Sequence, residues 1–132
     1  MLFEFLIPRR PLSVQAKKNR KKWKAFVISE AKKTWSGTSP YNSGDLHVTL
    51  VYLYDDAPVD VDNIIKPILD SLTGLIYDDD ILVTDVESHR RSLTGSFEIA
   101  KYPDLLVRGI LSGKECVYVK IEKSKALEDY LQ

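Results

Sequence analysis

The chain has very little cysteine and no long apolar run. Its 132 residues include one cysteine, Cys116, so no internal disulfide can form, and the sequence contains no paired-cysteine zinc pattern. No stretch approaches the roughly 18 consecutive apolar residues of a membrane-spanning helix. The first residues also lack the apolar core of a secretory signal peptide. We therefore expect no membrane partner and a cytosolic location.

The remaining composition is that of one globular domain. Apolar residues make up 44% of the chain and charged residues 29%, which is typical of a protein with an ordinary hydrophobic core. A chain of this length can bury such a core without disulfides or metals. Cys116 precedes the strand-like run Val117-Tyr118-Val119, so we expect a buried, unreactive thiol.

The formal net charge of zero hides a strong separation of charge along the chain. Residues 1–44 carry ten Lys or Arg and two acids, which gives +8. Residues 45–89 carry one Lys and eleven acids, which gives −10, and residues 90–132 carry eight cations and six acids, which gives +2. A basic segment followed by an acidic one suits a metal-dependent nuclease, in which cations hold phosphates and acids hold the metal. Two mutually neutralising faces of an ordinary protein would give the same sums.

Periodicity predicts an α/β (α+β) fold, with a small mixed β-sheet flanked by helices. His47 falls inside the clearest strand, so we expect a sheet residue there rather than a ligand. In helix 14–35, apolar residues recur every four positions. We expect strands at residues 2–7, 46–54, 81–86, 97–102 and 115–121, and helices at residues 14–35, from 60 or 62 to 72, and from about 124.

The acidic segment contains the most informative motif. It reads Asp60-Val-Asp62-Asn-Ile-Ile-Lys66, continues with Asp70, and is followed by Asp78-Asp79-Asp80. Magnesium prefers oxygen ligands and usually keeps several waters, so a few carboxylates can hold it. In residues 45–89, Lys66 is the single Lys or Arg beside eleven acids. It could contact a phosphate or keep the acids ionised.

Structural roles for the same acids remain open. Asp60 or Asp62 could cap the helix that follows, and Asp70 could bond a nearby backbone group. Residues 78–80 could form a solvated turn. A calcium-binding EF-hand loop is disfavoured, because Ile65 stands where that loop requires glycine.

The basic segment predicts contacts to a phosphate backbone. Six cations fall within eight residues, and Arg90 with Arg91 forms a second basic point. A solvated helix face is the alternative interpretation. The predicted DNA-binding residues are Lys17, Lys18, Arg20, Lys21, Lys22, Lys24, Arg90 and Arg91.

With its acidic motif, the chain resembles the RusA-type Holliday-junction resolvases. Their signature is Asp-x-Asp-Asn-x-x-Lys, then Asp-Ala-Leu, Gly and Asp-Asp, and the chain has Asp60 to Lys66, Asp70-Ser71-Leu72, Gly74 and Asp79-Asp80. Pro11-Leu-Ser13 is similar to the family's Pro-x-Ser opening, and the strand around Val117 to its last strand. Residues 92–113 look long for the family, and Ile81-Leu82 replaces more polar residues.

The resemblance implies a homodimeric endonuclease that cuts four-way DNA junctions with Mg²⁺, or with Mn²⁺ as a substitute ion, in a bacterial or phage context. Asp60, Asp62 and Asp80 would bind the metal, with Asp79 as a further candidate. Together with Lys66, the first three would form the catalytic group. A broader flap or branch nuclease, an inert DNA-binding relative and a metal-binding regulatory module remain as alternatives.

Overall fold

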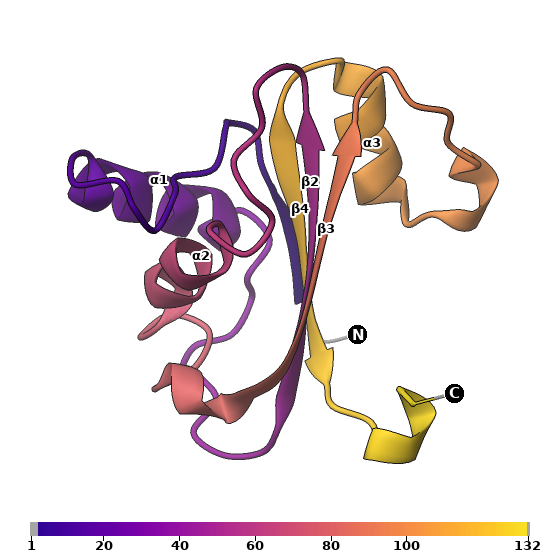
Figure 1. The fold of residues 1–132 in the computed structure, drawn as a ribbon. Helices are drawn as coiled ribbons and strands as arrows, with labels where there is room; N and C mark the ends of the chain where they lie inside the picture. Colours follow the sequence, from indigo (N-terminus) through magenta and orange to yellow (C-terminus); the bar gives the residue numbers. More distant parts are fainter. Residues whose placement is uncertain (1–2, 132) are drawn as a thin grey trace.

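A computed structural model describes residues 3–131, and its central element is a four-stranded sheet with helices on both faces (Figure 1). The bounds of the helices and strands, with 3-10 helices marked η, are β1 Phe3–Ile7, α1 Arg20–Lys32, β2 Leu46–Tyr54, α2 Ile65–Leu72, η1 Asp80–Leu82, β3 Val83–Ser92, η2 Ile99–Lys101, α3 Asp104–Ser112, β4 Cys116–Lys123 and η3 Leu127–Asp129.

The strand order is β1-β4-β2-β3, and the sheet is mixed. β4 pairs antiparallel with both β1 and β2, whereas β2 and β3 are parallel. The parallel pair needs a crossover connection, and the segment that contains α2 supplies it. This arrangement confirms the predicted α+β class. Within residues 3–131, no helix is both long and apolar enough to cross a bilayer.

One face of the sheet packs against α1 and α2 and holds the larger core (Figure 1). In β2, every second side chain from Leu46 to Tyr52 points into this core, as the two-residue repeat of a strand requires. α2 contributes Ile68 and Leu72, both with no exposed surface. On α1, the buried residues are Trp23, Val27 and Ala31, which are three of the four members of the predicted four-residue repeat. The fourth, Trp35, lies beyond the end of α1 and is half-buried against the same core.

The other face packs against α3 at one end of the sheet. Leu53, Leu106, Cys116 and Tyr118 form its buried cluster. Gly109 lets α3 approach closely, because a Cβ there would lie 3.1 Å from Cys116 Sγ. The Cys116 side chain is buried as predicted, and burial raises the pKa of its thiol to about 11.

The basic helix is shorter than predicted at both ends. The expected range was 14–35, whereas α1 covers Arg20–Lys32. Asn19 has a left-handed backbone (φ 68°) that breaks the helical path, and Ser13 Oγ accepts from the Gln15 N–H at 3.1 Å to form a turn upstream. Lys17 and Lys18 therefore lie in a loop.

The prediction that Asp60 or Asp62 caps α2 is wrong. α2 begins at Ile65, and no side chain caps it. The preceding turn closes through backbone oxygens, with the N–H of Asn63 bonded to Asp60 O at 3.0 Å and that of Ile65 to Asp62 O at 3.4 Å. α2 ends at Leu72 as predicted, and Gly74, two residues further on, has a left-handed φ of 90°.

Three further predictions need correction. The acidic triplet does not open a strand directly, because η1 covers Asp80–Leu82 and β3 runs on to Ser92. Residues 97–102 contain η2 rather than a strand, and α3 was not predicted. The expected C-terminal helix is a single turn, η3. The predicted strands 46–54 and 115–121 correspond to β2 and β4, and the first strand is confirmed over residues 3–7, with Leu2 outside the described residues.

The packing of α2 gives a direct test of the core. We expect Ile68→Ala to lower the free energy of unfolding by about 2–4 kcal/mol, because it leaves a cavity between α2 and the sheet. Ile81→Ala is the matched control, since Ile81 is 76% exposed and should change stability by less than about 0.5 kcal/mol. Urea unfolding measures both, and equal effects would contradict the packing described.

Candidate functional site

The loop between β2 and α2, residues 59–64, carries the first two acids of the motif; we call it the acidic loop. Its main chain is anchored to β3. The Ser88 hydroxyl donates to the carbonyl oxygen of Val61 at 2.8 Å, and Arg90 Nη1 donates to that of Val59 at 3.2 Å. The loop is therefore positioned by its backbone, and its acidic side chains point outward.

Asp60 and Asp62 are both exposed. The N–H of Val14 donates to Asn63 O at 2.8 Å, which ties the same loop to the N-terminal segment. Among the described residues, neither carboxylate accepts a hydrogen bond, because the bonds inside the turn use main-chain oxygens. Their oxygens are available to a ligand.

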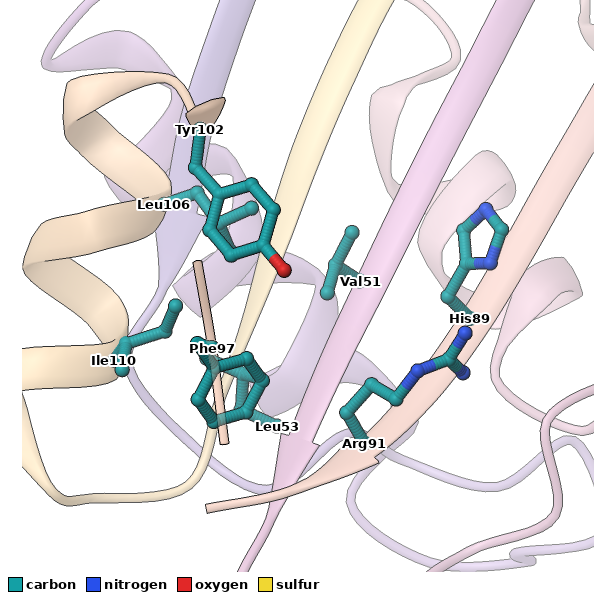
Figure 2. A pocket seen from close by; sticks show the side chains of 8 residues that line it. All are labelled: Val51, Leu53, His89, Arg91, Phe97, Tyr102, Leu106 and Ile110. Atoms are coloured by element: carbon teal, nitrogen blue, oxygen red, sulfur yellow. The ribbon is translucent and has the colours of Figure 1, made fainter. Parts of the chain in front are cut away.

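One cation faces the acidic loop. Arg90 Nη1 lies 3.8 Å from Asp60 Oδ1, and the guanidinium carbon lies 5.8 Å from the centre of the Tyr54 ring. Arg91 lies on the opposite face of the sheet, where it lines a separate cavity near α3 (Figure 2). The predicted basic point Arg90–Arg91 is therefore divided between the two faces.

Lys66 links α2 to η1, the 3-10 helix that precedes β3. Its Nζ lies 2.7 Å from Asp80 Oδ2 and 3.0 Å from Asp70 Oδ1. The hydrogen bonds to Asp80 and Asp70 raise the pKa of Lys66 above its usual range. The hydrogen bond from Lys66 in turn lowers the pKa of Asp80, so both groups stay charged at neutral pH. Asp70 is thus paired with a side chain and not with the backbone.

The other two acids of the triplet lie beside this pair. Asp79 Oδ1 accepts from the N–H of Ile81 at 3.1 Å and so caps η1. The N–H of Asp78 bonds to Tyr41 O at 2.9 Å, and its side chain is exposed. Asp79 thus has a structural role that uses one of its two carboxylate oxygens.

The structure brings Lys66 and Asp80 together but does not assemble a complete metal cage. Within residues 3–131, no group of three or more His, Cys, Asp or Glu is placed to hold a metal ion. Asp60 and Asp62 lie in the acidic loop that precedes α2, and Asp80 is held to the first turn of α2 by Lys66. The side chains of Asp60, Asp62 and Asp80 all offer carboxylate oxygens, which are the type of ligand that Mg²⁺ prefers.

Beside the acidic loop lies a hollow of about 620 Å³, which we call the basic groove. Its cations are Arg9, Arg10 and Lys22, and none of the described residues that line it is acidic. Val59, the first residue of the acidic loop, also lines it. The groove therefore leads from the start of α1 to the exposed acids.

The two arginines of the groove are held in place. Arg10 Nη2 donates to Ala57 O at 2.6 Å, and its Nη1 lies 3.4 Å from Glu115 Oε1. Arg9 stacks on Phe26 with its guanidinium carbon 3.7 Å from the ring centre. Such fixed guanidinium groups lose little freedom when they bind a phosphate.

The predicted basic residues lie at different distances from this groove, and they line different hollows. Lys17, Arg20, Lys21 and Lys22 line a second hollow of about 400 Å³ that shares Lys22 with the basic groove. Arg20 donates to the carbonyl oxygens of Val14 and Ala16, at 2.8 Å each, so it also braces the loop. Lys18 is exposed, and Lys24 lines a smaller cavity between α1 and α2 together with Lys66 and Asp70.

Fold and site together define a small α+β domain in which exposed carboxylates lie next to a groove of arginines and lysines. The family described as Endodeoxyribonuclease RusA matches residues 9–100, which is 92 of the 132 residues. The chain belongs to this endodeoxyribonuclease family. The match contains the basic groove, Lys66 and the acids, and it ends before α3 and β4. Comparison with curated proteins gave no match.

The sequence interpretation missed Arg9 and Arg10. The available signal was an arginine pair between a strand and Pro11, next to the Pro-x-Ser motif. Only the strand order shows that this pair lies beside Val59, fifty residues further along the chain.

The Lys66–Asp80 pair can be tested without metal. In Lys66→Met, we expect the pKa of Asp80 to rise toward its ordinary value, measured by NMR titration of its carboxyl carbon. The native pair stabilises the fold above the ordinary carboxyl pKa, and this contribution is lost as pH falls through the lowered pKa. At neutral pH the variant should lose at most about 1 kcal/mol, because the pair is exposed. An unchanged pKa of Asp80 would contradict the contact.

Proposed function

We propose that the chain is a Mg²⁺-dependent endonuclease that resolves four-way (Holliday) DNA junctions. The observation that carries the proposal is the position of exposed Asp60 and Asp62 beside a basic groove without acids. Membership of an endodeoxyribonuclease family supports DNA as the substrate. The groove would hold one strand through its phosphates, contacts that position DNA without reading its sequence.

Asp60, Asp62 and Asp80 would hold the metal, with Asp79 as a further ligand. Asp80 uses Oδ2 for Lys66, so Oδ1 remains for an ion. Asp60 and Asp62 accept no hydrogen bond among the described residues, and Asp60 Oδ1 lies 3.8 Å from Arg90 Nη1. A bound Mg²⁺ would supply an activated water and stabilise the leaving oxygen of the phosphodiester. An all-carboxylate site suits such a hard cation, and Mn²⁺ would be a substitute.

The remaining charged groups would bind and orient the phosphate. Lys66 lies between Asp70 and Asp80 with its side chain 58% exposed, so it could place one positive charge at the scissile phosphate. Charge development there would be stabilised most by groups that are already fixed. Arg90 is such a group, because Val59 O orients it beside Asp60.

Paired symmetric cuts in a junction require two active sites that face opposite strands. We therefore propose that a homodimer performs the reaction, because a two-fold axis relates two identical sites.

The test of substrate and metal is cleavage of a labelled synthetic four-way junction, compared with linear duplex and a flap. Each substrate is incubated with Mg²⁺ or with EDTA. We expect paired nicks in the junction alone, and only with Mg²⁺. Cutting of all branched forms would favour the flap or branch nuclease, and tight binding without cutting in Mg²⁺ or Mn²⁺ would favour an inert DNA-binding relative.

The acidic loop is tested by Asp62→Asn. We expect cleavage to fall by at least about 100-fold, an order typical of lost transition-state stabilisation, while junction binding stays largely intact. Asp45→Asn is the matched control, because Asp45 is an exposed acid in a different loop. Loss of both binding and cleavage, with a changed circular dichroism spectrum, would indicate misfolding and contradict a purely catalytic role.

The basic groove is tested by charge reversal on α1. Lys21→Glu with Lys22→Glu should weaken junction binding and reduce the slope of log K against log salt by about 1–2, because each lost phosphate contact removes about 0.9. Lys32→Glu is the control on the last turn of the same helix, outside both basic hollows. Fluorescence anisotropy at several salt concentrations measures the slope. Equal slopes for both variants would remove this part of α1 from the DNA interface.

A further inference from the structure

The most exposed large apolar side chain of the described residues stands next to the acids of the candidate site. It belongs to Ile81, which is 76% exposed and follows Asp80 directly in η1. Leu82, the next residue, packs against the larger core, whereas Ile81 belongs to neither hydrophobic cluster of residues 3–131. Single exposed apolar residues are common on protein surfaces, so the position of Ile81 beside the acids matters more than its exposure.

The turn that carries Ile81 is held in a defined position. Asp79 Oδ1 accepts from the N–H of Ile81 at 3.1 Å, and the N–H of Leu82 bonds to Asp79 O at 3.2 Å. On the other side of Ile81 in the turn, Asp80 is tied to Lys66 Nζ at 2.7 Å. An apolar side chain on so fixed a backbone loses little conformational freedom when a ligand buries it.

A second exposed apolar side chain lies on β3. Val86 is 38% exposed, and among the described residues it belongs to neither hydrophobic cluster. Alternate residues of a strand share a face, so Val86 lies on the same face as Ser88 and Arg90, which hold the acidic loop. β3 therefore presents apolar surface between the turn that carries Asp80 and the point where the acidic loop is attached.

Apolar surface at this place suits neither a phosphate nor a hydrated metal ion. Phosphates bind cations and N–H donors, and Mg²⁺ takes oxygen ligands. In the grooves of a duplex, the base edges offer mostly hydrogen-bond donors and acceptors. The apolar parts of DNA are the faces of its bases, which a continuous duplex buries in its stack. A base face becomes available where the stack is interrupted, as at the crossover of a branched DNA.

We propose that Ile81 is a wedge that inserts between bases at the crossover of branched DNA and so sets the preference for branched over linear DNA. Isoleucine is one of the apolar side chains with which proteins separate neighbouring base steps. Val86 packs on the sugar of the displaced nucleotide. Because Ile81 follows Asp80 directly, the separated step lies next to the phosphodiester that the acids would cut.

This inference rests on the proposed function, because it assigns a substrate shape to the same acidic site. In a continuous duplex, the insertion of Ile81 must first separate a stacked step, and that cost offsets the gain from burying one side chain. At a crossover the stack is already interrupted, so most of the cost is absent. Phosphate contacts in the basic groove are available in both forms of DNA. Ile81 therefore strengthens binding to the junction and leaves binding to duplex unchanged.

The test is binding of a labelled four-way junction and of linear duplex by the full chain in EDTA, measured by fluorescence anisotropy. Ile81→Ser should raise the Kd for the junction by about tenfold, the loss expected for one buried isoleucine, and should leave the Kd for duplex unchanged. Ile81→Leu keeps the apolar volume and should bind the junction like wild type. Leu111→Ser is the matched control, because Leu111 is 72% exposed and lies on α3, at the opposite face of the sheet.

A second readout follows the bases themselves. A fluorescent adenine analogue that is quenched by stacking replaces one base at the crossover. In EDTA, wild type and Ile81→Leu should raise its fluorescence, and Ile81→Ser should not. Circular dichroism confirms that each variant is folded. An Ile81→Ser variant that binds the junction and raises the fluorescence like wild type would overturn the proposal, as would equal losses of junction binding in Ile81→Ser and Leu111→Ser.

Binding and cleavage are read separately, so the two proposals can fail independently. Mg²⁺-dependent cutting that is confined to junctions and is equal in wild type and Ile81→Ser would overturn the wedge and leave the proposed activity. Junction-selective binding with a fluorescence rise that depends on Ile81, but without cutting in Mg²⁺ or Mn²⁺, would support the wedge and overturn the activity. Equal affinity of wild type for junction and duplex would also overturn the wedge.

Discussion

The parallel pairing of β2 with β3 determines where the rest of the site lies. Parallel neighbours cannot be joined by a tight turn, so the chain must cross from the end of β2 to the start of β3 through α2. All the acids of the proposed site lie in that crossover. Because β3 then runs beside β2, Ser88 and Arg90 reach the backbone of the acidic loop. One pairing thus positions both the acids and the residues that hold them.

Where local signals agreed, the sequence was enough to predict the elements. β2 was predicted to the residue, because β-branched and aromatic side chains fill it and turn residues flank it. α3 was missed because Gly109 interrupts its pattern and costs about 1 kcal/mol relative to alanine in a helix. That glycine is explained by the close approach of α3 to Cys116 and Leu6. The basic helix was predicted too long, because a run of lysines favours a helix and gives no sign of the left-handed backbone at Asn19 that interrupts it.

The site shows the same division between local and long-range information. The motif placed Lys66 and Asp80 in one predicted site, and the structure brings these two residues into contact although they lie 14 positions apart. Between them in the sequence lies the buried Tyr77, whose hydroxyl donates to Leu69 O at 2.6 Å and so holds the returning chain against α2. The basic groove had no comparable local signal. Arg9 follows β1 and Val59 follows β2. The two residues come close together because both of these strands pair with β4.

The C-terminal part of the chain is needed for the site although the family match ends at residue 100. β1 pairs with β4 and with no other strand, and β4 lies between β1 and β2. Arg9 and Arg10 follow β1 directly, so the basic groove exists only if β4 holds β1 in the sheet. Arg10 also contacts Glu115, the residue before β4. The segment outside the matched region therefore supports the groove from within the sheet.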